Sequence, residues 1–201
     1  MASYLRWVVV LFCVAGIAAA SAVRASAGLL GTGSASYCDP NSSQVFKPWG
    51  DGSNYMLTPG GSFEVGTPSW KLGGGAKIVS GNESFFIHSK TDRKSLYMPA
   101  GSSASSPSMC FATGDWHLRF VGSGSGQVRV AVTVNSLLGV LSILDGGTVS
   151  NNGTWKPSPK VGLLLTNVGG LLTTNAISLR FTATSGASQL DDVYLDPFKD
   201  T

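Results

Sequence analysis

The stretch 127–134, which reads Gln-Val-Arg-Val-Ala-Val-Thr-Val, decides the fold because valine recurs at every second position. Side chains alternate between the two faces of a β-strand, so the valines point to one face while Arg129 and Thr133 point to the other. The segment therefore predicts a strand that buries its valine face in a core and leaves its other face in water.

The same alternation recurs in two further segments. Large apolar residues occupy every second position in both of them, namely Trp116, Leu118 and Phe120 in one and Ile177, Leu179 and Phe181 in the other. Shorter candidate strands, bounded by Gly, Pro, Asn or Asp clusters, lie at 62–65, 70–72, 76–79, 85–88, 95–98, 138–144, 161–165 and 190–195. Leucines in 163–172 would fit a short helical turn, but Gly169 and Gly170 argue against it. The pattern predicts an all-β chain folded as a two-sheet antiparallel β-sandwich or jelly roll.

The N-terminus has the organisation of a secretion signal. Arg6 precedes an apolar run at 7–20, and small residues then offer cleavage sites after Ala22 or Ala27. An uncleaved anchor is the alternative, but the run is about 14 residues long and roughly 20 are needed to span a bilayer. We therefore expect a signal peptide at 1–27, a flexible Gly/Ser-rich lead-in at 28–36 and a single domain at 37–201. The mature chain would be secreted or held in the cell envelope, without membrane insertion.

Cleavage also changes the count of cysteines and charges. Cys13 leaves with the signal, so the three cysteines become the pair Cys38 and Cys110, which predicts a disulfide in an oxidising compartment. Such a bridge closes a loop of about 70 residues and contributes about 4 kcal/mol on the chain-entropy model. Two free buried thiols are the alternative. The formal charge of +3 falls by two when Arg6 and Arg24 are removed, so electrostatic capture of nucleic acid is not indicated.

Short motifs spread over about residues 60 to 198 resemble the galactose-binding-like jelly rolls found among carbohydrate-binding modules of secreted glycosidases. The motifs are Gly-Gly-Ser-Phe-Glu-Val-Gly at 60–66, Pro-Ser-Trp at 68–70, Lys-Ser-Leu-Tyr-Met at 94–98, Gly-Thr-Trp-Lys-Pro at 153–157 and Leu-Asp-Asp-Val-Tyr-Leu at 190–195. The chain departs from that family in the extra segment 37–59, which carries Cys38 and Trp49.

The resemblance implies a structural calcium ion held by an acidic residue of the first motif and one of the last strand. Carried onto this sequence, these residues are Glu64 and Asp191, with Asp192 and Asp92 in reserve, and carboxylates are the hard ligands that calcium requires. Asp191 shares strand parity with Val193, so it would point inward and need a cation or hydrogen-bond partners. The alternative is a solvated Glu64 and an Asp191 that caps a turn.

Catalytic chemistry finds little support in the sequence. The G-x-S-x-G pattern at 122–126 lies between two predicted strands, whereas a nucleophile elbow leads from a strand into a helix. The carboxylates show no pairing that would predict glycoside hydrolysis. We therefore expect a protein that is not an enzyme.

A binding face is the better-supported hypothesis. If the three alternating strands share a sheet, His117, Arg119, Arg129 and Arg180 form one outward row of donors suited to sugar hydroxyls or carboxylated glycans. A merely solvated sheet face is the alternative. Aromatic platforms also bind sugars, and the freer candidates are Trp49, Tyr55 and Tyr97, with Trp49 first among them.

These observations favour a secreted, non-catalytic β-sandwich that binds cell-wall or extracellular carbohydrate. The alternatives are a structural or protein-interaction domain of the cell envelope and, third, a hydrolase or lyase on the same scaffold.

Overall fold

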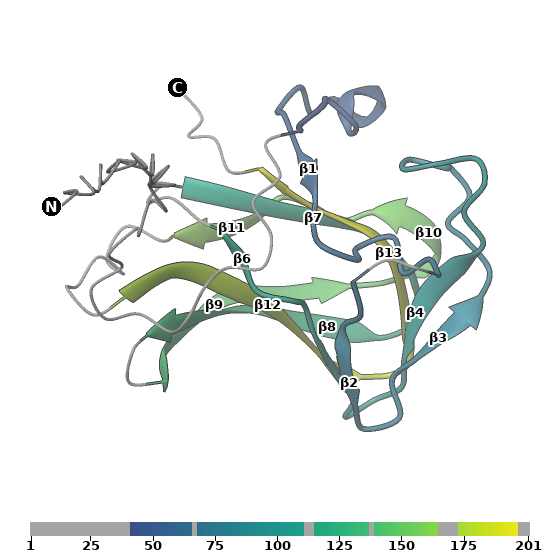
Figure 1. Ribbon diagram of the computed structural model, residues 1–201. Helices are drawn as coiled ribbons and strands as arrows, with labels where there is room; N and C mark the ends of the chain where they lie inside the picture. The colour runs from purple at the N-terminus through teal and green to yellow at the C-terminus, as the bar shows by residue number, and fades with distance from the viewer. Residues whose placement is uncertain (1–40, 66–67, 111–114, 137–138, 165–172, 197–201) are drawn as a thin grey trace, which may run out of the picture.

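A computed structural model describes residues 41–65, 68–110, 115–136, 139–164 and 173–196, and their strands form two packed antiparallel sheets (Figure 1). The first sheet has the order β10 (Gly153–Pro157), β7 (Asp115–Gly124), β13 (Ser188–Asp196), β4 (Lys94–Met98) and β3 (Lys77–Ser80), with β1 (Met56–Leu57) paired to β13 and β11 (Val161–Leu164) paired to β7. The second sheet has the order β2 (Lys71–Gly73), β5 (Ser103–Ser105), β12 (Thr173–Ser185), β8 (Gln127–Ser136) and β9 (Gly139–Ser150), with β6 (Met109–Cys110) paired to β12. The predicted two-sheet β-sandwich is confirmed.

The core lies between the sheets, where the alternation placed it. The inward residues of the three strong strands are buried wherever the structure describes their side chains: Trp116, Leu118, Phe120, Val128, Val130, Val132, Ile177, Leu179 and Phe181. Trp70 is buried with them and stacks on Phe181, with ring centroids 5.5 Å apart and planes 6° apart. Residues 122–126 comprise the end of β7 and the turn that joins it to β8, so the G-x-S-x-G pattern lies in a β-hairpin and is not a nucleophile elbow.

Two predicted strands, 62–65 and 85–88, are not strands in the structure. Phe63 has φ 56° and Phe86 has φ 54°, which are left-handed backbone conformations that an extended strand excludes. Phe63 is buried at its turn, whereas Phe85 and Phe86 are exposed in a loop. A short apolar run predicts a strand in both cases, because it does not show whether its residues lie in a strand, at a buried turn or on the surface.

An additional layer covers the outer face of the first sheet. It consists of the part of the segment 41–57 that precedes β1, which includes the short 3₁₀ helix η1 (Lys47–Trp49), and of the 81–93 loop between β3 and β4. Phe46 is fully buried in this layer, and its ring meets those of Tyr55 and Tyr194 at centroid distances of 5.0 and 5.7 Å. The described part of the extra segment, from residue 41 on, is thus packed as part of the folded unit.

A β-bulge in β13 decides where the acidic residues of the last strand point. Asp191 is opposite Val121 and Tyr194 is opposite Arg119, so two residues of β13 oppose one of β7. Asp192 occupies the bulge with φ 47°. The extra residue changes the parity of the strand, so Val193 lies in the core while Asp191 contacts the 81–93 loop. The inward orientation expected for Asp191 is therefore wrong, although its burial is confirmed.

Several expectations concern residues outside the described ranges. The signal peptide at 1–27, the lead-in at 28–36 and Cys38 lie there, so cleavage and the disulfide with Cys110 stay predictions. In the part of the chain that the structure describes, no helix has the length and apolar character needed to cross a bilayer.

Candidate functional site

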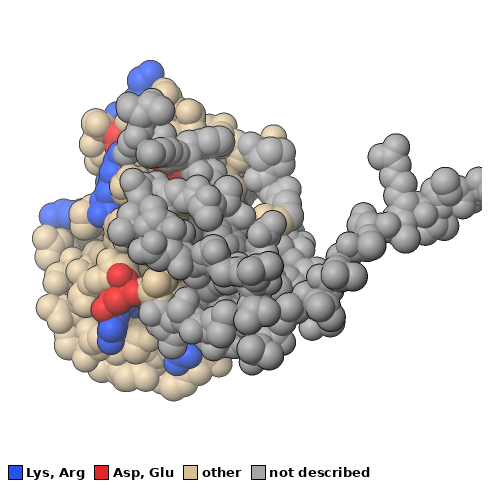
Figure 2. Space-filling model, turned by 90° about the vertical axis from the view of Figure 1, so that its left-hand side faces the viewer, with Lys and Arg blue, Asp and Glu red and all other residues tan. Residues whose placement is uncertain are grey.

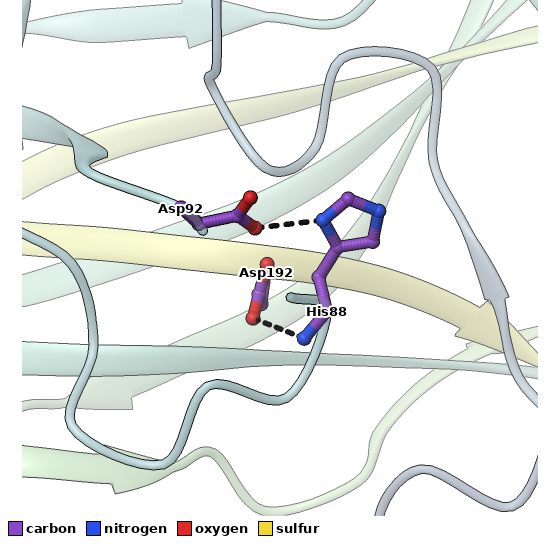
Figure 3. Close-up of side chains that lie close together, drawn as sticks. All are labelled: His88, Asp92 and Asp192. Carbon is purple, nitrogen blue, oxygen red and sulfur yellow. Dashed lines mark hydrogen bonds and ion pairs between the residues drawn. The ribbon is translucent and has the colours of Figure 1, made fainter. Parts of the chain in front are cut away.

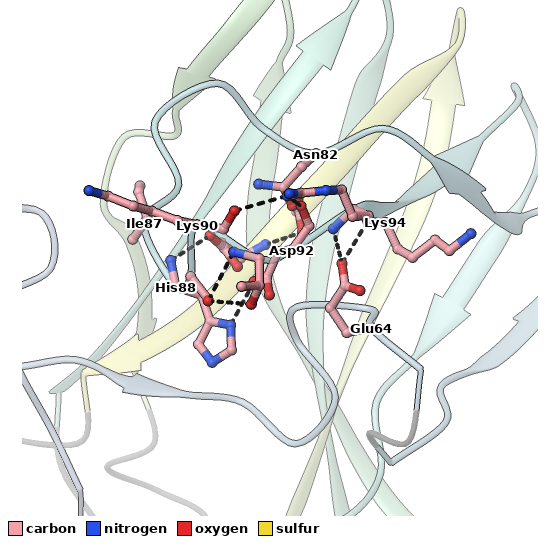
Figure 4. Close-up of polar contacts among 12 residues, drawn as sticks. Glu64, Asn82, Ile87, His88, Lys90, Asp92 and Lys94 are labelled. Carbon is pink, nitrogen blue, oxygen red and sulfur yellow. Dashed lines mark hydrogen bonds and ion pairs between the residues drawn. The ribbon is translucent and has the colours of Figure 1, made fainter.

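The 81–93 loop is anchored to the sandwich by carboxylates that accept hydrogen bonds from its backbone (Figure 4). Asp191 Oδ2 accepts the N–H of Glu83 at 3.0 Å, and Asp192 Oδ2 accepts the N–H of His88 at 3.0 Å. At the end of the loop, Glu64 Oε1 accepts the N–H groups of Arg93 and Lys94, both at 2.6 Å. Three separate acidic side chains of the sandwich thus fix the path of one loop.

The loop also carries its own internal acceptor, Glu83. One oxygen of its carboxylate accepts the N–H of Phe85, and the other accepts the N–H of Ile87 at 2.6 Å. The side chain is fully buried. A buried carboxylate with backbone donors on both oxygens fixes a tight local conformation, and Phe86 at φ 54° lies between those donors.

Burial of so many acids has an electrostatic cost. Burial and the neighbouring Asp192 raise the pKa of Asp191 to about 9, and burial together with Glu83 raises the pKa of Asp192 to about 7, although the N–H donors oppose both shifts. The imidazole of His88 is close to a further acid of this region, with its Nδ1 2.7 Å from Asp92 Oδ2. We define Glu83, His88, Asp92, Asp191 and Asp192 as the β13 acidic cluster.

Part of this cluster converges on one point. His88, Asp92 and Asp192 each offer one ligand atom, and these atoms lie within 4.8 Å of one another (Figure 3). Asp192 Oδ1 is buried and makes no hydrogen bond in the described part of the chain. This donor set suits a cation.

The calcium ligands implied by the resemblance are arranged differently from the expectation. Both oxygens of Asp191 accept N–H groups, from Glu83 and from Asp192, and Glu64 accepts those of two loop residues. The group that converges on one point contains instead the two acids held in reserve, Asp192 and Asp92. Calcium at Glu64 and Asp191 stays a prediction that these hydrogen bonds do not favour.

Beside the cluster, three large aromatic side chains are exposed. Trp49, Phe85 and Phe86 have 38, 40 and 43% of their surface accessible, and we define them as the aromatic surface. The rings of Trp49 and Phe85 meet edge to face with centroids 5.1 Å apart. The sequence singled out Trp49 but missed the two phenylalanines, because it assigned them to a strand. Adjacent aromatic residues inside a polar segment were the available indication.

The other aromatic candidates are less accessible. Tyr55 is 1% exposed, and its hydroxyl donates to Asp51 Oδ2 at 2.7 Å, so its expected freedom is wrong. Tyr97 is half-buried, with the Lys77 ammonium 5.7 Å from its ring centroid.

The expected single row of donors does not exist. His117 and Arg119 belong to β7 of the first sheet, whereas Arg129 and Arg180 belong to β8 and β12 of the second. Moreover, Arg119 is 7% exposed because the segment 41–57 covers it. Its guanidinium pairs with Asp51 at 2.8 Å, donates to the Ser158 carbonyl at 2.9 Å and lies over the Phe46 ring. The premise of the predicted face is therefore wrong, and Arg119 is structural.

Arg129 and Arg180 do share the outer face of the second sheet. Arg129 pairs with Asp145 at 2.7 Å, and both side chains are more than half exposed. Arg180 is exposed and lies opposite Ser105. On the side of the molecule that Figure 2 displays, the visible Lys and Arg side chains are scattered, and some lie beside acidic ones.

No family model and no curated protein matches the chain. Solved structures do resemble it. A family 61 carbohydrate-binding module in complex with β-1,4-galactotriose is 20% identical, with 72% of this chain and 98% of that chain covered at a TM-score of 0.45. The CBM22-1 xylan-binding domain of Paenibacillus barcinonensis Xyn10C is 12% identical, with 73% and 94% covered at a TM-score of 0.44.

An enzyme also occurs among the similar structures. The enzymatically active domain of tailspike protein 4 from bacteriophage CBA120 is 12% identical, with 71% of this chain but 21% of that chain covered at a TM-score of 0.49. Identities this low describe the fold and not the ligand. The strand pairing itself makes the described part of the protein a two-sheet antiparallel β-sandwich.

Proposed function

We propose that this chain is a non-catalytic carbohydrate-binding domain and that the aromatic surface is where a sugar ring packs. The observation that carries the proposal is the exposed, mutually packed pair of Trp49 and Phe85. Large aromatic side chains left in water next to each other mark interaction sites, and the apolar face of a pyranose ring packs well on them.

The anchoring of the 81–93 loop supports this assignment. Backbone N–H groups on both sides of Phe86 are held by Glu83, and those of Glu83 and His88 are held by β13. Binding to a loop that is already ordered avoids the entropic cost of ordering it, so modest sugar contacts can still give measurable affinity.

A binding role also suits the acidic residues better than a catalytic one. Glu83, Asp191 and Asp192 are fully buried and hold backbone groups, so a substrate would not meet them without disruption of the loop. Their role in the proposal is to position the aromatic surface. Secretion, inferred from the N-terminal residues, would place the domain where polysaccharides are found.

The test is retention of the purified domain on a panel of neutral and acidic polysaccharides, with native affinity electrophoresis as readout. Trp49→Ala and Phe85→Ala should each weaken retention by about tenfold, which corresponds to about 1.4 kcal/mol. Leu72→Ala is the matched control, because Leu72 is 37% exposed on β2 of the other sheet. Wild-type protein that is retained by none of the polysaccharides, but binds an envelope protein, would support the protein-interaction alternative.

A further inference from the structure

His88, Asp92 and Asp192 together offer one imidazole nitrogen and two carboxylate oxygens as possible ligand atoms. His88 and Asp92 come from the 81–93 loop and Asp192 comes from the bulge of β13, so the group joins two elements (Figure 3). Asp92 and Asp192 are 4 and 0% exposed, whereas the His88 side chain is 39% exposed. The group is therefore a mostly buried site with one side open to solvent.

A second observation points to a ligand at this place. Asp192 Oδ2 accepts the His88 N–H, but Asp192 Oδ1 is buried and makes no hydrogen bond to any described residue. In Figure 3 this second oxygen points towards Asp92. A buried carboxylate oxygen without a partner costs free energy unless a proton or a cation satisfies it.

The kind of cation follows from the donors. Calcium and magnesium take oxygen ligands, whereas an imidazole nitrogen combined with carboxylates is typical of zinc and other divalent transition metals. We propose that His88, Asp92 and Asp192 bind a divalent transition metal, with zinc as the representative ion. His88 Nδ1 provides the nitrogen, and the ion replaces the hydrogen bond that now joins it to Asp92 Oδ2.

The geometry needs little adjustment to hold such an ion. Zinc ligands lie about 2.0 to 2.2 Å from the metal, so two of them are at most about 4.4 Å apart. The three ligand atoms are within 4.8 Å of one another, and the half-exposed imidazole can move to accommodate the ion. The ion would tie the loop to β13 close to Phe85 and Phe86. Only the connection between the ion and sugar binding at these two residues rests on the proposed function.

The test is calorimetric titration of the full chain with zinc chloride after treatment with EDTA and dialysis. We expect one zinc ion per chain, not displaced by excess calcium, and visible absorption from bound cobalt that reports its coordination geometry and that changes in His88→Gln. His88→Gln should weaken zinc binding by at least about tenfold, since even removal of groups that only orient a ligand costs 10- to 100-fold. His117→Gln is the matched control, because His117 lies on β7 outside the cluster.

Three results would overturn the proposal: a folded wild-type chain that does not bind zinc, zinc binding of equal strength in His88→Gln, or displacement of zinc by calcium. If His88→Gln does not fold, Asp92→Asn decides the matter, because retained affinity contradicts the site and lost affinity supports it. Zinc binding is measured without any glycan, so failure here and failure of the carbohydrate proposal are separate results.

Discussion

Arg119 is buried by a segment that the alternating pattern of its own strand does not predict. The pattern of β7 correctly turns Arg119 away from the sandwich core, but the segment 41–57 then covers it with Phe46 and Asp51. Asp192 is a similar case, because the bulge that orients it shows in the sequence only as a spacing of three residues, instead of two, between the core residues Leu190 and Val193. Alternation reports which sheet face a residue is on; it does not report what lies over that face.

The buried pair of Asp51 and Arg119 should contribute strongly to stability. Asp51→Ala would leave the Arg119 charge buried without its partner, so we expect the free energy of unfolding to fall by about 3 kcal/mol or more in urea unfolding at pH 7. Asp145→Ala removes the exposed partner of Arg129 and should cost less than about 1 kcal/mol. Equal losses in the two variants would contradict the structural role assigned to Asp51.

The same pair predicts sensitivity to acid. Burial acts to raise the pKa of Asp51, but hydrogen bonds from Tyr55 and Arg119 outweigh it and hold the pKa well below its usual range. Because this pKa lies below the unfolded value of about 3.9, the stabilising contribution is present above that value and is lost as the pH falls through the folded pKa. Urea midpoints at pH 6 and pH 3 should therefore differ less in Asp51→Asn than in the wild type. An unchanged difference would show that Asp51 does not titrate in this way.

At the scale of elements, the sequence predicts strands well and loops poorly. Val128, Val130 and Val132 identify β8 because a half-buried strand imposes period two on its residues. By contrast, Phe85, Phe86 and Ile87 form an apolar run that suggests a strand, whereas Glu83 holds them in a turn through backbone bonds. Such a hydrogen bond between a backbone N–H and a side chain forms only in the folded loop and leaves no periodic pattern in the sequence.

The 81–93 loop should lose its order when its internal acceptor is removed. Glu83→Ala leaves the N–H groups of Phe85 and Ile87 without their acceptor, so we expect amide exchange at both positions to accelerate by about tenfold or more. Amides of β8 serve as the internal control and should keep their protection. If the loop positions the aromatic surface, polysaccharide retention should fall in this variant although Trp49 is intact; undiminished retention would remove the positioning role.

At the scale of the whole molecule, the two candidate surfaces belong to different sheets. The aromatic surface lies on the layer that covers the first sheet, while Arg129 and Arg180 lie on the outer face of the second. The sequence could not separate them, because three alternating strands show the same pattern whether they share a sheet or face each other across a core.

This separation gives a prediction for the arginines. Joint replacement of Arg129 and Arg180 by Ala should leave retention on neutral polysaccharides unchanged, because the ligand would pack against the opposite side of the domain. Native affinity electrophoresis of the double variant beside Trp49→Ala tests it. Retention lost by the arginine variant and kept by Trp49→Ala would transfer the binding site to the second sheet.

The layer over the first sheet also bears on how the chain reaches its native state. Thr58 Oγ1 donates to the carbonyl of Val193, a residue 135 positions further along the chain, and β1 pairs with β13. The segment 41–57 therefore cannot complete its pairing until residues 188–196 have emerged from the ribosome, and closing so long a loop slows the search for native contacts. Folding should take milliseconds to seconds rather than microseconds, and Trp49 should reach its native place only once β13 is available.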